Sequence, residues 1–163
     1  MKKLLLLLLI PLVSCGQNRT LDEEVKLLYR NTVPVISKVE LDSLIAVDST
    51  LVLLDCREVE EFTVSHLADA QLASYGSFKA EELKLNSKDY PVVVYCSIGY
   101  RSERIGEKLQ DEGFTNVFNL YGGIFEWKNN GGVVVDSKTN ITEKVHTYNK
   151  QWSKFLEVGE KVY

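Results

Sequence analysis

Two short apolar runs, each followed by polar or reactive residues, constrain most strongly how this chain can fold. Leu51–Leu54 is followed by Asp55 and Cys56, and Val92–Tyr95 is followed by Cys96. Continuous apolar runs of this length are typical of strands covered on both faces in a parallel sheet. Segments with helical spacing lie between the apolar runs, so strands and helices alternate. The sequence therefore predicts an α/β fold, with a mainly parallel central sheet flanked by helices on both faces.

The composition fits one globular domain. The chain has 163 residues, a net charge of −4 and 45% hydrophobic residues. Basic residues gather in no single segment, which argues against a nucleic-acid partner. The two histidines, His66 and His146, are too far apart in the sequence to form a metal motif. We therefore expect no metal site and no cofactor.

The first residues have the pattern of an export signal. Two lysines precede an apolar run that ends at Val13, which is too short to cross a bilayer as a mature helix. The sequence around Cys15 resembles a bacterial lipoprotein signal, in which Cys15 becomes the lipidated first residue. The alternative is an ordinary signal peptide with an incidental cysteine. Lipid on Cys15 would anchor a soluble domain to a bacterial membrane outside the cytoplasm, facing the periplasm if the cell has two membranes.

Cys96 is the candidate nucleophile. It lies between a predicted strand and a predicted helix, for which Ser102 is the expected N-cap. A tight turn before a helix gathers backbone N–H groups, and these stabilise an anion together with the helix dipole. Such surroundings favour a thiolate, and Arg101 adds a positive charge. The alternative is a buried structural cysteine, but the arginine and the helix favour thiolate chemistry.

Four stretches, in order, resemble the single-domain rhodanese family of sulfurtransferases and cover about residues 35–132. They are Leu54-Asp55-Cys56-Arg57-Glu58 with Glu61-Phe62, Ser65-His66-Leu67-Ala68-Asp69-Ala70, Val94-Tyr95-Cys96-Ser97-Ile98-Gly99-Tyr100-Arg101-Ser102, and Leu120-Tyr121-Gly122-Gly123-Ile124 with Trp127. The resemblance implies that Cys96 takes a sulfane sulfur from a small donor such as thiosulfate. The resulting persulfide would then pass its sulfur to a thiol or cyanide-like acceptor. The loop residues Ser97, Ile98, Gly99, Tyr100 and Arg101 would cradle the persulfide and the anionic donor.

The chain departs from the family pattern in the loop, in the preceding turn and at Cys56. Ser97 stands where a basic residue is common, which leaves Arg101 as the only cation of the loop and would weaken affinity for thiosulfate. Ser65 replaces a glycine, and Ala68-Asp69 replaces a Pro-Gly pair. Cys56 stands where an aliphatic residue is usual.

The remaining candidate residues are assigned supporting roles. We expect Asp55 and Arg57 to brace the sheet edge beside the loop. His66 is expected to hold a turn, with general-base catalysis as the less favoured alternative. Cys56 is either a buried substitute for an aliphatic side chain or a resolving thiol that forms a reversible disulfide with Cys96.

The N-terminal signal pattern and the resemblance together divide the chain. Residues 1–14 are expected to be a lipoprotein signal peptide, and 15–34 the lipidated cysteine, a tether and a short helix. Residues 35–132 form the expected rhodanese-like domain, and 133–163 an extension packed on it. Within the domain, the sequence favours a helix over 77–85.

Three other functions compete with sulfur transfer. Cysteine phosphatases also place a cysteine–arginine loop before a helix, but their loop is longer than the four residues between Cys96 and Arg101. A non-catalytic rhodanese-like binding module often lacks the cysteine that this chain retains. A thiol–disulfide redox protein would use Cys56 with Cys96.

Overall fold

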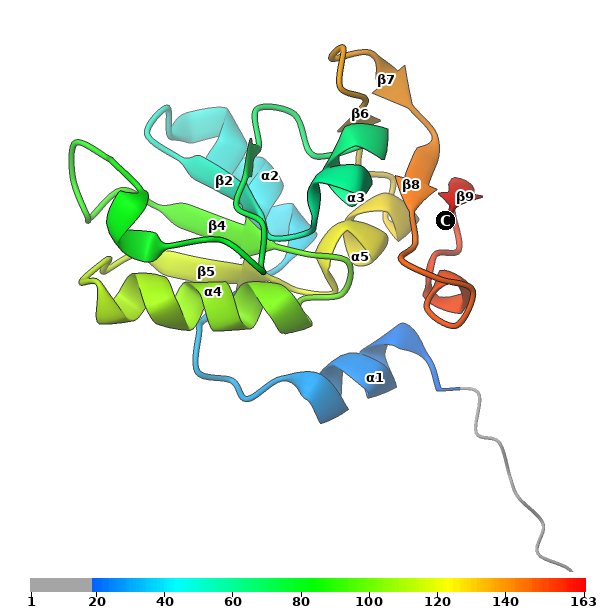
Figure 1. The fold of residues 1–163 in the computed structure, drawn as a ribbon, viewed down its shortest axis with the longest axis horizontal. Helices are drawn as coiled ribbons and strands as arrows, with labels where there is room; N and C mark the ends of the chain where they lie inside the picture. Colours follow the sequence, from blue (N-terminus) through cyan, green and yellow to red (C-terminus); the bar gives the residue numbers. More distant parts are fainter. Residues whose placement is uncertain (1–18) are drawn as a thin grey trace, which may run out of the picture.

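A computed structural model describes residues 19–163 (Figure 1). The predicted signal peptide and Cys15 lie outside these residues. Between residues 19 and 163, no helix combines the length and the apolar character that crossing a membrane requires.

The centre of the fold is a sheet of five strands, all of them parallel. In spatial order they are β1 (Val35–Ile36), β5 (Val117–Leu120), β4 (Val92–Tyr95), β2 (Val52–Asp55) and β3 (Gln71–Leu72). Every residue of β2 and β4 is buried, as expected for apolar strands covered on both faces. The predicted α/β fold with a mainly parallel sheet is confirmed.

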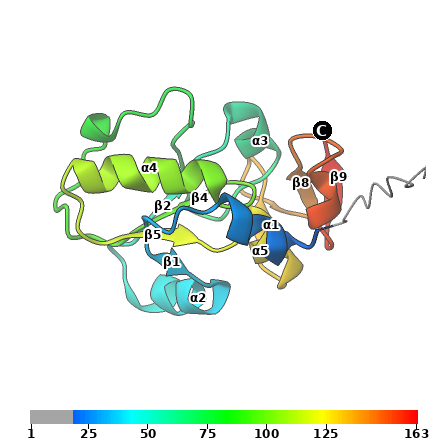
Figure 2. The same ribbon diagram turned by 90° about the horizontal axis from the view of Figure 1, so that it is seen from below.

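Helices cover both faces of this sheet. The described helices are α1 (Leu21–Leu28), α2 (Lys38–Val47), α3 (Val59–Val64), α4 (Tyr100–Asp111) and α5 (Gly123–Asn129). Figure 2 shows α4 on one face of the sheet and α2 on the other. Capping boxes start α1 and α2, because Thr20 pairs with Glu23, and Ser37 with Glu40. The helix expected over 77–85 is instead a single 3₁₀ turn, Ala80–Glu82.

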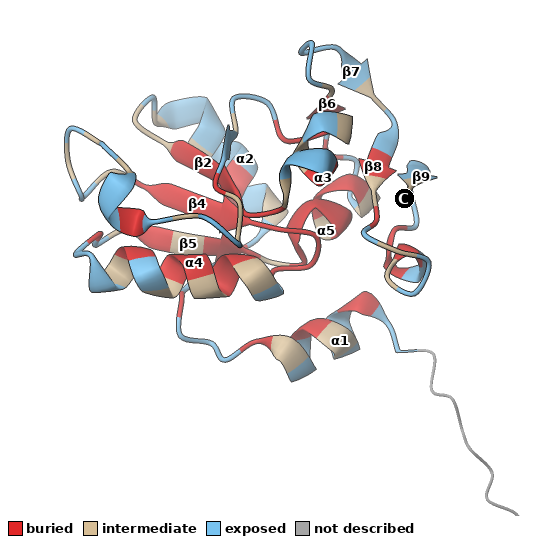
Figure 3. Cartoon of the chain, viewed as in Figure 1, coloured by how far each residue is buried: buried red, intermediate tan, exposed pale blue. Residues whose placement is uncertain are grey.

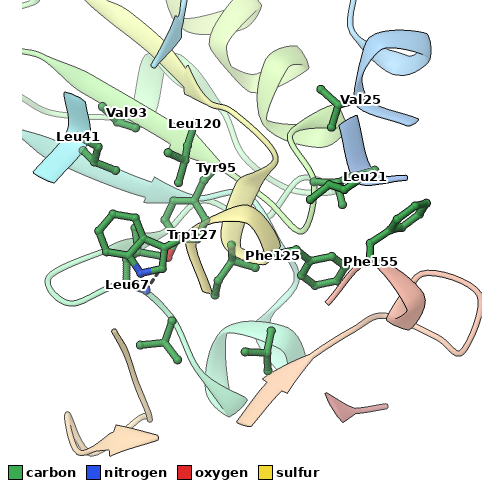
Figure 4. Packing of buried hydrophobic residues seen from close by; sticks show 14 of the residues in the cluster. Leu21, Val25, Leu41, Leu67, Val93, Tyr95, Leu120, Phe125, Trp127 and Phe155 are labelled. Carbon is green, nitrogen blue, oxygen red and sulfur yellow. Dashed lines mark hydrogen bonds between the residues drawn. The ribbon is translucent and has the colours of Figure 1, made fainter. Parts of the chain in front are cut away.

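Alternation along the strands separates two hydrophobic clusters. Leu53, Val93 and Tyr95 face a cluster that includes Leu41 of α2 and Phe125 of α5 (Figure 4). The neighbouring positions Val52, Leu54, Val92 and Val94 face the second cluster, with Ile105 and Leu109 of α4. Buried residues therefore run through the strands and the inner sides of the helices (Figure 3).

Segments at both ends of the described chain join the first cluster. Leu21 and Val25 of α1 pack in it together with Val145, Phe155 and Leu156 from the C-terminal segment. The C-terminal strands are β6 (Val134–Val135), β7 (Ile141–Thr142), β8 (Lys144–His146) and β9 (Glu160–Val162), and a 3₁₀ turn at Ser153–Phe155 lies between β8 and β9. β6 pairs with β7, and β8 pairs with β9. These segments are therefore packed parts of the fold.

Candidate active site at the Cys96 loop

Cys96 comes directly after β4, at the carboxyl edge of the sheet, and its loop leads into α4. Gly99 adopts a left-handed φ of 97° at the helix N-cap. From there its backbone N–H donates a hydrogen bond to Cys96 Sγ at 3.1 Å. The loop thus directs an amide donor at the sulfur, as expected for a site that stabilises a thiolate.

The expected N-cap role of Ser102 is wrong. α4 begins at Tyr100 with Gly99 as its N-cap, so Ser102 lies inside the first turn. Its hydroxyl donates to Asn119 Oδ1 at 2.7 Å. The Asn119 amide in turn donates to the Gly99 carbonyl at 3.0 Å, and both side chains are buried. Ser102 therefore ties the helix to β5.

Tyr29, just after α1, supports the loop from outside the sheet. Its hydroxyl donates to the Ile98 carbonyl at 2.9 Å and accepts from the Gly122 N–H at 3.2 Å. Burial and the nearby charge of Cys96 raise the pKa of Tyr29, so the hydroxyl keeps its proton. A Cβ on Gly99 would lie only 1.6 Å from the Tyr29 oxygen. The loop conformation therefore depends on a glycine at 99 and on the N-terminal helix.

Arg101 is held by Glu61 of α3. Its two terminal nitrogens donate to the Glu61 carboxylate at 2.7 and 2.8 Å. The Ser97 hydroxyl joins them, donating to Glu61 at 3.1 Å and accepting from Arg101 at 3.0 Å. Burial by itself would raise the pKa of Glu61, but the hydrogen bonds and charge of Arg101 hold this pKa below its usual value. The cation of the loop is therefore paired within the protein.

Asp55, Arg57 and His66 hold the neighbouring sheet edge. Arg57 and Asp55 form a fully buried ion pair at 2.6 Å, and Arg57 also donates to the Ser65 carbonyl at 2.6 Å. The His66 ring stacks on Phe62, with 3.8 Å between ring centroids, and its Nδ1 lies 2.9 Å from the Phe62 carbonyl oxygen. These contacts place the three side chains in structural positions around the turn.

Cys56 lies beside Cys96 in the sheet. Asp55 pairs with Tyr95 in the register of β2 and β4, so the two cysteines follow at matching positions and share a hydrophobic cluster. Both are free thiols in this structure. Burial, with the nearby charge of Cys96, raises the pKa of Cys56 well above its usual value. Cys56 therefore remains a neutral thiol in a closed environment.

Cys96 also lines a pocket of about 480 Å³ whose polar wall consists of Glu58, Ser97 and Arg101. Among residues 19–163 there is no group of three or more histidine, cysteine or acidic side chains placed to hold a metal ion. The chemistry that this pocket presents is therefore that of a cysteine, an amide donor and a paired arginine.

The fold and the site together define a class of protein. It is an α/β domain in which a loop carrying a cysteine connects a central strand to a helix. The rhodanese-like domain family matches residues 37–130. This match spans more than half of the chain, so the chain belongs to the rhodanese-like family.

Relatives in sequence include sulfurtransferases and proteins with other names. The thiosulfate sulfurtransferase GlpE of Coxiella burnetii is 32% identical over 78 residues, which cover 48% of this chain and 72% of that protein. The putative sulfur carrier protein YrkF of Bacillus subtilis is 28% identical over 97 residues, 60% of this chain and 52% of that protein. A tRNA uridine(34) hydroxylase of Protochlamydia amoebophila is 32% identical over 114 residues, 66% of this chain but 35% of its own length.

Solved structures show the same fold. A rhodanese-related protein of Thermoplasma volcanium is 26% identical with a TM-score of 0.53, covering 63% of this chain and 97% of that protein. A thiosulfate sulfurtransferase of Pseudomonas aeruginosa has a TM-score of 0.59 at 20% identity, covering 66% of this chain and 21% of that protein. At this identity the second likeness concerns the fold alone.

Proposed function

We propose that this protein is a sulfurtransferase that carries a sulfane sulfur as a persulfide on Cys96. The observation that carries the proposal is the hydrogen bond from the Gly99 N–H to Cys96 Sγ, in a pocket that Arg101 also lines. A thiolate needs such donors to form, and the group it displaces needs nearby positive charge. The sulfurtransferase relatives support the same chemistry.

The reaction has two balanced steps. In the first, the Cys96 thiolate attacks the outer sulfur of a donor such as thiosulfate. The donor S–S bond breaks, a new S–S bond forms on Cys96, and sulfite leaves with the bonding electron pair. In the second, an acceptor such as a thiolate or cyanide attacks the outer sulfur, and the Cys96 thiolate is restored. The loop from Ser97 to Arg101 would surround the persulfide in both steps, with Ser97, Ile98, Tyr100 and Arg101 lining the pocket.

We further propose that lipid on Cys15 holds the protein at a bacterial membrane outside the cytoplasm. The proposal rests on the lysines, the short apolar run and the position of the cysteine in residues 1–15. A Cys15→Ser variant should move from the membrane fraction and lose the mass of the lipid. If wild type carries no lipid at Cys15, the anchor proposal is wrong.

The persulfide is tested by intact mass after treatment with thiosulfate. The sample is reduced protein without residues 1–15, which retains every described residue. Wild type and a Cys56→Ala variant should each gain one sulfur atom, which cyanide then removes, and Cys96→Ala should gain none. A gain on Cys96→Ala would contradict the assignment of Cys96.

Thiol–disulfide exchange is a second candidate, because Cys56 and Cys96 lie at matching positions of adjacent strands. It predicts a loss of two hydrogen atoms, in place of a gain of sulfur, when the protein is oxidised. No mass change with any sulfane donor would favour a binding module without catalysis.

A further inference from the structure

The Cys96 pocket is mainly apolar and aromatic. Its nonpolar wall is formed by six side chains, those of Leu28, Tyr75, Ile98, Tyr100, Tyr148 and Trp152. Cys96 is only 1% exposed, whereas Tyr100 and Tyr148 are 40% and 57% exposed. The sulfur therefore lies at the floor, and the two tyrosines lie at the rim. A volume of about 480 Å³ is in the range of pockets that hold organic ligands, and thiosulfate is far smaller.

Half of this apolar wall comes from outside the matched rhodanese-like segment, 37–130. Leu28 is the last residue of α1, and Tyr148 and Trp152 lie between β8 and the 3₁₀ turn at Ser153–Phe155. Figures 1 and 2 show α1 and this C-terminal segment at the same end of the sheet. The two terminal segments thus add an apolar enclosure to a loop that the domain itself supplies.

Tyr148 is held at the pocket rim in a strained backbone conformation. Its φ is +64°, in a region that residues other than glycine, asparagine and aspartate rarely adopt. Its backbone N–H donates to His146 Nδ1 at 3.1 Å, and its ring lies 5.7 Å from the Arg101 guanidinium carbon. Burial does not explain the strain, because the side chain is more than half exposed. Strain of this kind tends to gather at binding sites.

The charges around the pocket disfavour a doubly charged donor. Arg101 is the only cation among the described lining residues, and both its terminal nitrogens are engaged by Glu61. Glu58 adds a carboxylate to the same wall. A dianion such as thiosulfate would find no unpaired cation there to offset the free energy of removing its charge from water. A neutral or singly charged organic molecule would have a smaller desolvation cost.

We propose that the pocket binds the hydrophobic organic group R of a thiol–persulfide couple, R–SH and R–S–SH. This rests on the proposed function and names the substrate class of the same site. The Cys96 thiolate attacks the outer sulfur of R–S–SH, forming Cys96–S–SH, while the thiolate R–S⁻ leaves with the electron pair of the broken S–S bond. The outer sulfur keeps its proton, and the reverse reaction loads an R–S⁻ acceptor.

The test compares two thiol acceptors, benzyl mercaptan and 2-mercaptoethanol, on protein persulfidated at Cys96. The ratio of their rates is divided by the ratio measured with cysteine persulfide in solution, which removes intrinsic reactivity. Burial of the phenyl ring should raise the corrected ratio in wild type about tenfold. A corrected ratio near one would overturn the proposal.

Two variants and a matched control locate the effect. Tyr148→Asn, which suits a positive φ, and Trp152→Ala should each lower the corrected ratio. Tyr163 has the same 57% exposure as Tyr148 but is not among the residues that line the pocket, so Tyr163→Asn should leave the ratio unchanged. Equal ratios in Tyr148→Asn and wild type would overturn the role of the rim.

A binding measurement separates this inference from the proposed function. Benzyl methyl sulfide has the same phenyl group but no thiol, so it cannot react. Ligand-observed NMR should show that it binds Cys96→Ser protein and that Tyr148→Asn, introduced in addition, weakens the binding several-fold. Absence of binding would overturn the pocket assignment even if Cys96 forms a persulfide. Binding without any persulfide on wild type would support the pocket and contradict sulfur transfer.

Discussion

The Arg101 guanidinium and the Glu61 carboxylate form a two-pronged ion pair that joins α4 to α3 beside the candidate nucleophile. Its two contacts fix the direction of the guanidinium, and its geometry is that of a strong charge-assisted pair. The same pair offsets the positive charge that an anionic donor would meet. Glu61 therefore holds Arg101 in place beside Cys96 and, under the proposed function, would reduce the attraction of the loop for anionic donors.

The ion pair should make the acid stability of the protein depend on Glu61. The pKa of Glu61 in the folded protein is below its ordinary value of 4.5. The ionised side chain therefore stabilises the fold above about pH 4.5, and this contribution is lost as the pH falls through the folded-state pKa. Glu61→Gln should lower the free energy of unfolding by about 2 kcal/mol near neutral pH, measured with urea.

The difference between wild type and Glu61→Gln should shrink as the pH is lowered from about 5 to about 3. Glu60→Gln is the matched control, because Glu60 is the adjacent residue on the same helix and is exposed. It should change the free energy of unfolding by less than about 0.5 kcal/mol. A constant difference across the acid range for Glu61→Gln would contradict the role of its charge.

Gly99 should tolerate no side chain, for two separable reasons. It adopts φ +97°, and a Cβ would overlap the Tyr29 hydroxyl. Gly131 also has a positive φ, +77°, but a Cβ there meets nothing within 4 Å. Gly131→Ala should therefore cost only the conformational penalty, about 1–2 kcal/mol. Gly99→Ala should cost at least about 3 kcal/mol and disrupt the loop. Equal losses in urea unfolding would show that the overlap relaxes freely.

The sequence predicts the sheet well because its central strands are buried on both faces. Leu51–Leu54 and Val92–Tyr95 have no polar alternation to confuse the assignment, and both are strands within a residue of those bounds. The helix predicted over 77–85 does not form, because the apolar residues of this segment do not lie on one face of a helix. Phe78 and Leu85 would share one face of a helix, but Leu83 would point away, and all three pack against the same cluster. Only the turn at Ala80–Glu82 forms.

The candidate site is predictable where it is local in sequence. The cysteine, its loop and its arginine occur within one short stretch. The partners that set their properties come from far along the chain, because Tyr29 is 69 residues from Ile98 and Glu61 is 40 from Arg101. Ser102 looks like a helix cap by composition, but a left-handed Gly99 takes that position. Tyr148 and Trp152 carry no motif, so only the fold brings them to the pocket.

Tyr29 should contribute to both stability and reactivity. Tyr29→Phe removes the hydroxyl that bridges the Ile98 carbonyl and the Gly122 amide and leaves both without that partner. The free energy of unfolding should fall by about 1–3 kcal/mol. Persulfide formation at Cys96 should slow, because Ile98 and Gly99 carry the loop amide that contacts the sulfur. Tyr163→Phe is the control, since its hydroxyl contacts Ser153 in the C-terminal segment. An unchanged rate in Tyr29→Phe would show that the loop holds its shape without this bridge.

Cys56 should prove dispensable for sulfur transfer. It is fully buried, its thiol donates to the Leu54 carbonyl at 3.7 Å, and burial keeps its pKa high. Cys56→Val is close in volume, so the free energy of unfolding should change by less than about 1.5 kcal/mol. The rate and yield of persulfide at Cys96 should match wild type with and without a reductant. Loss of a reductant requirement in Cys56→Val alone would instead identify Cys56 as a resolving thiol, because only a Cys56–Cys96 disulfide would make wild type depend on reduction.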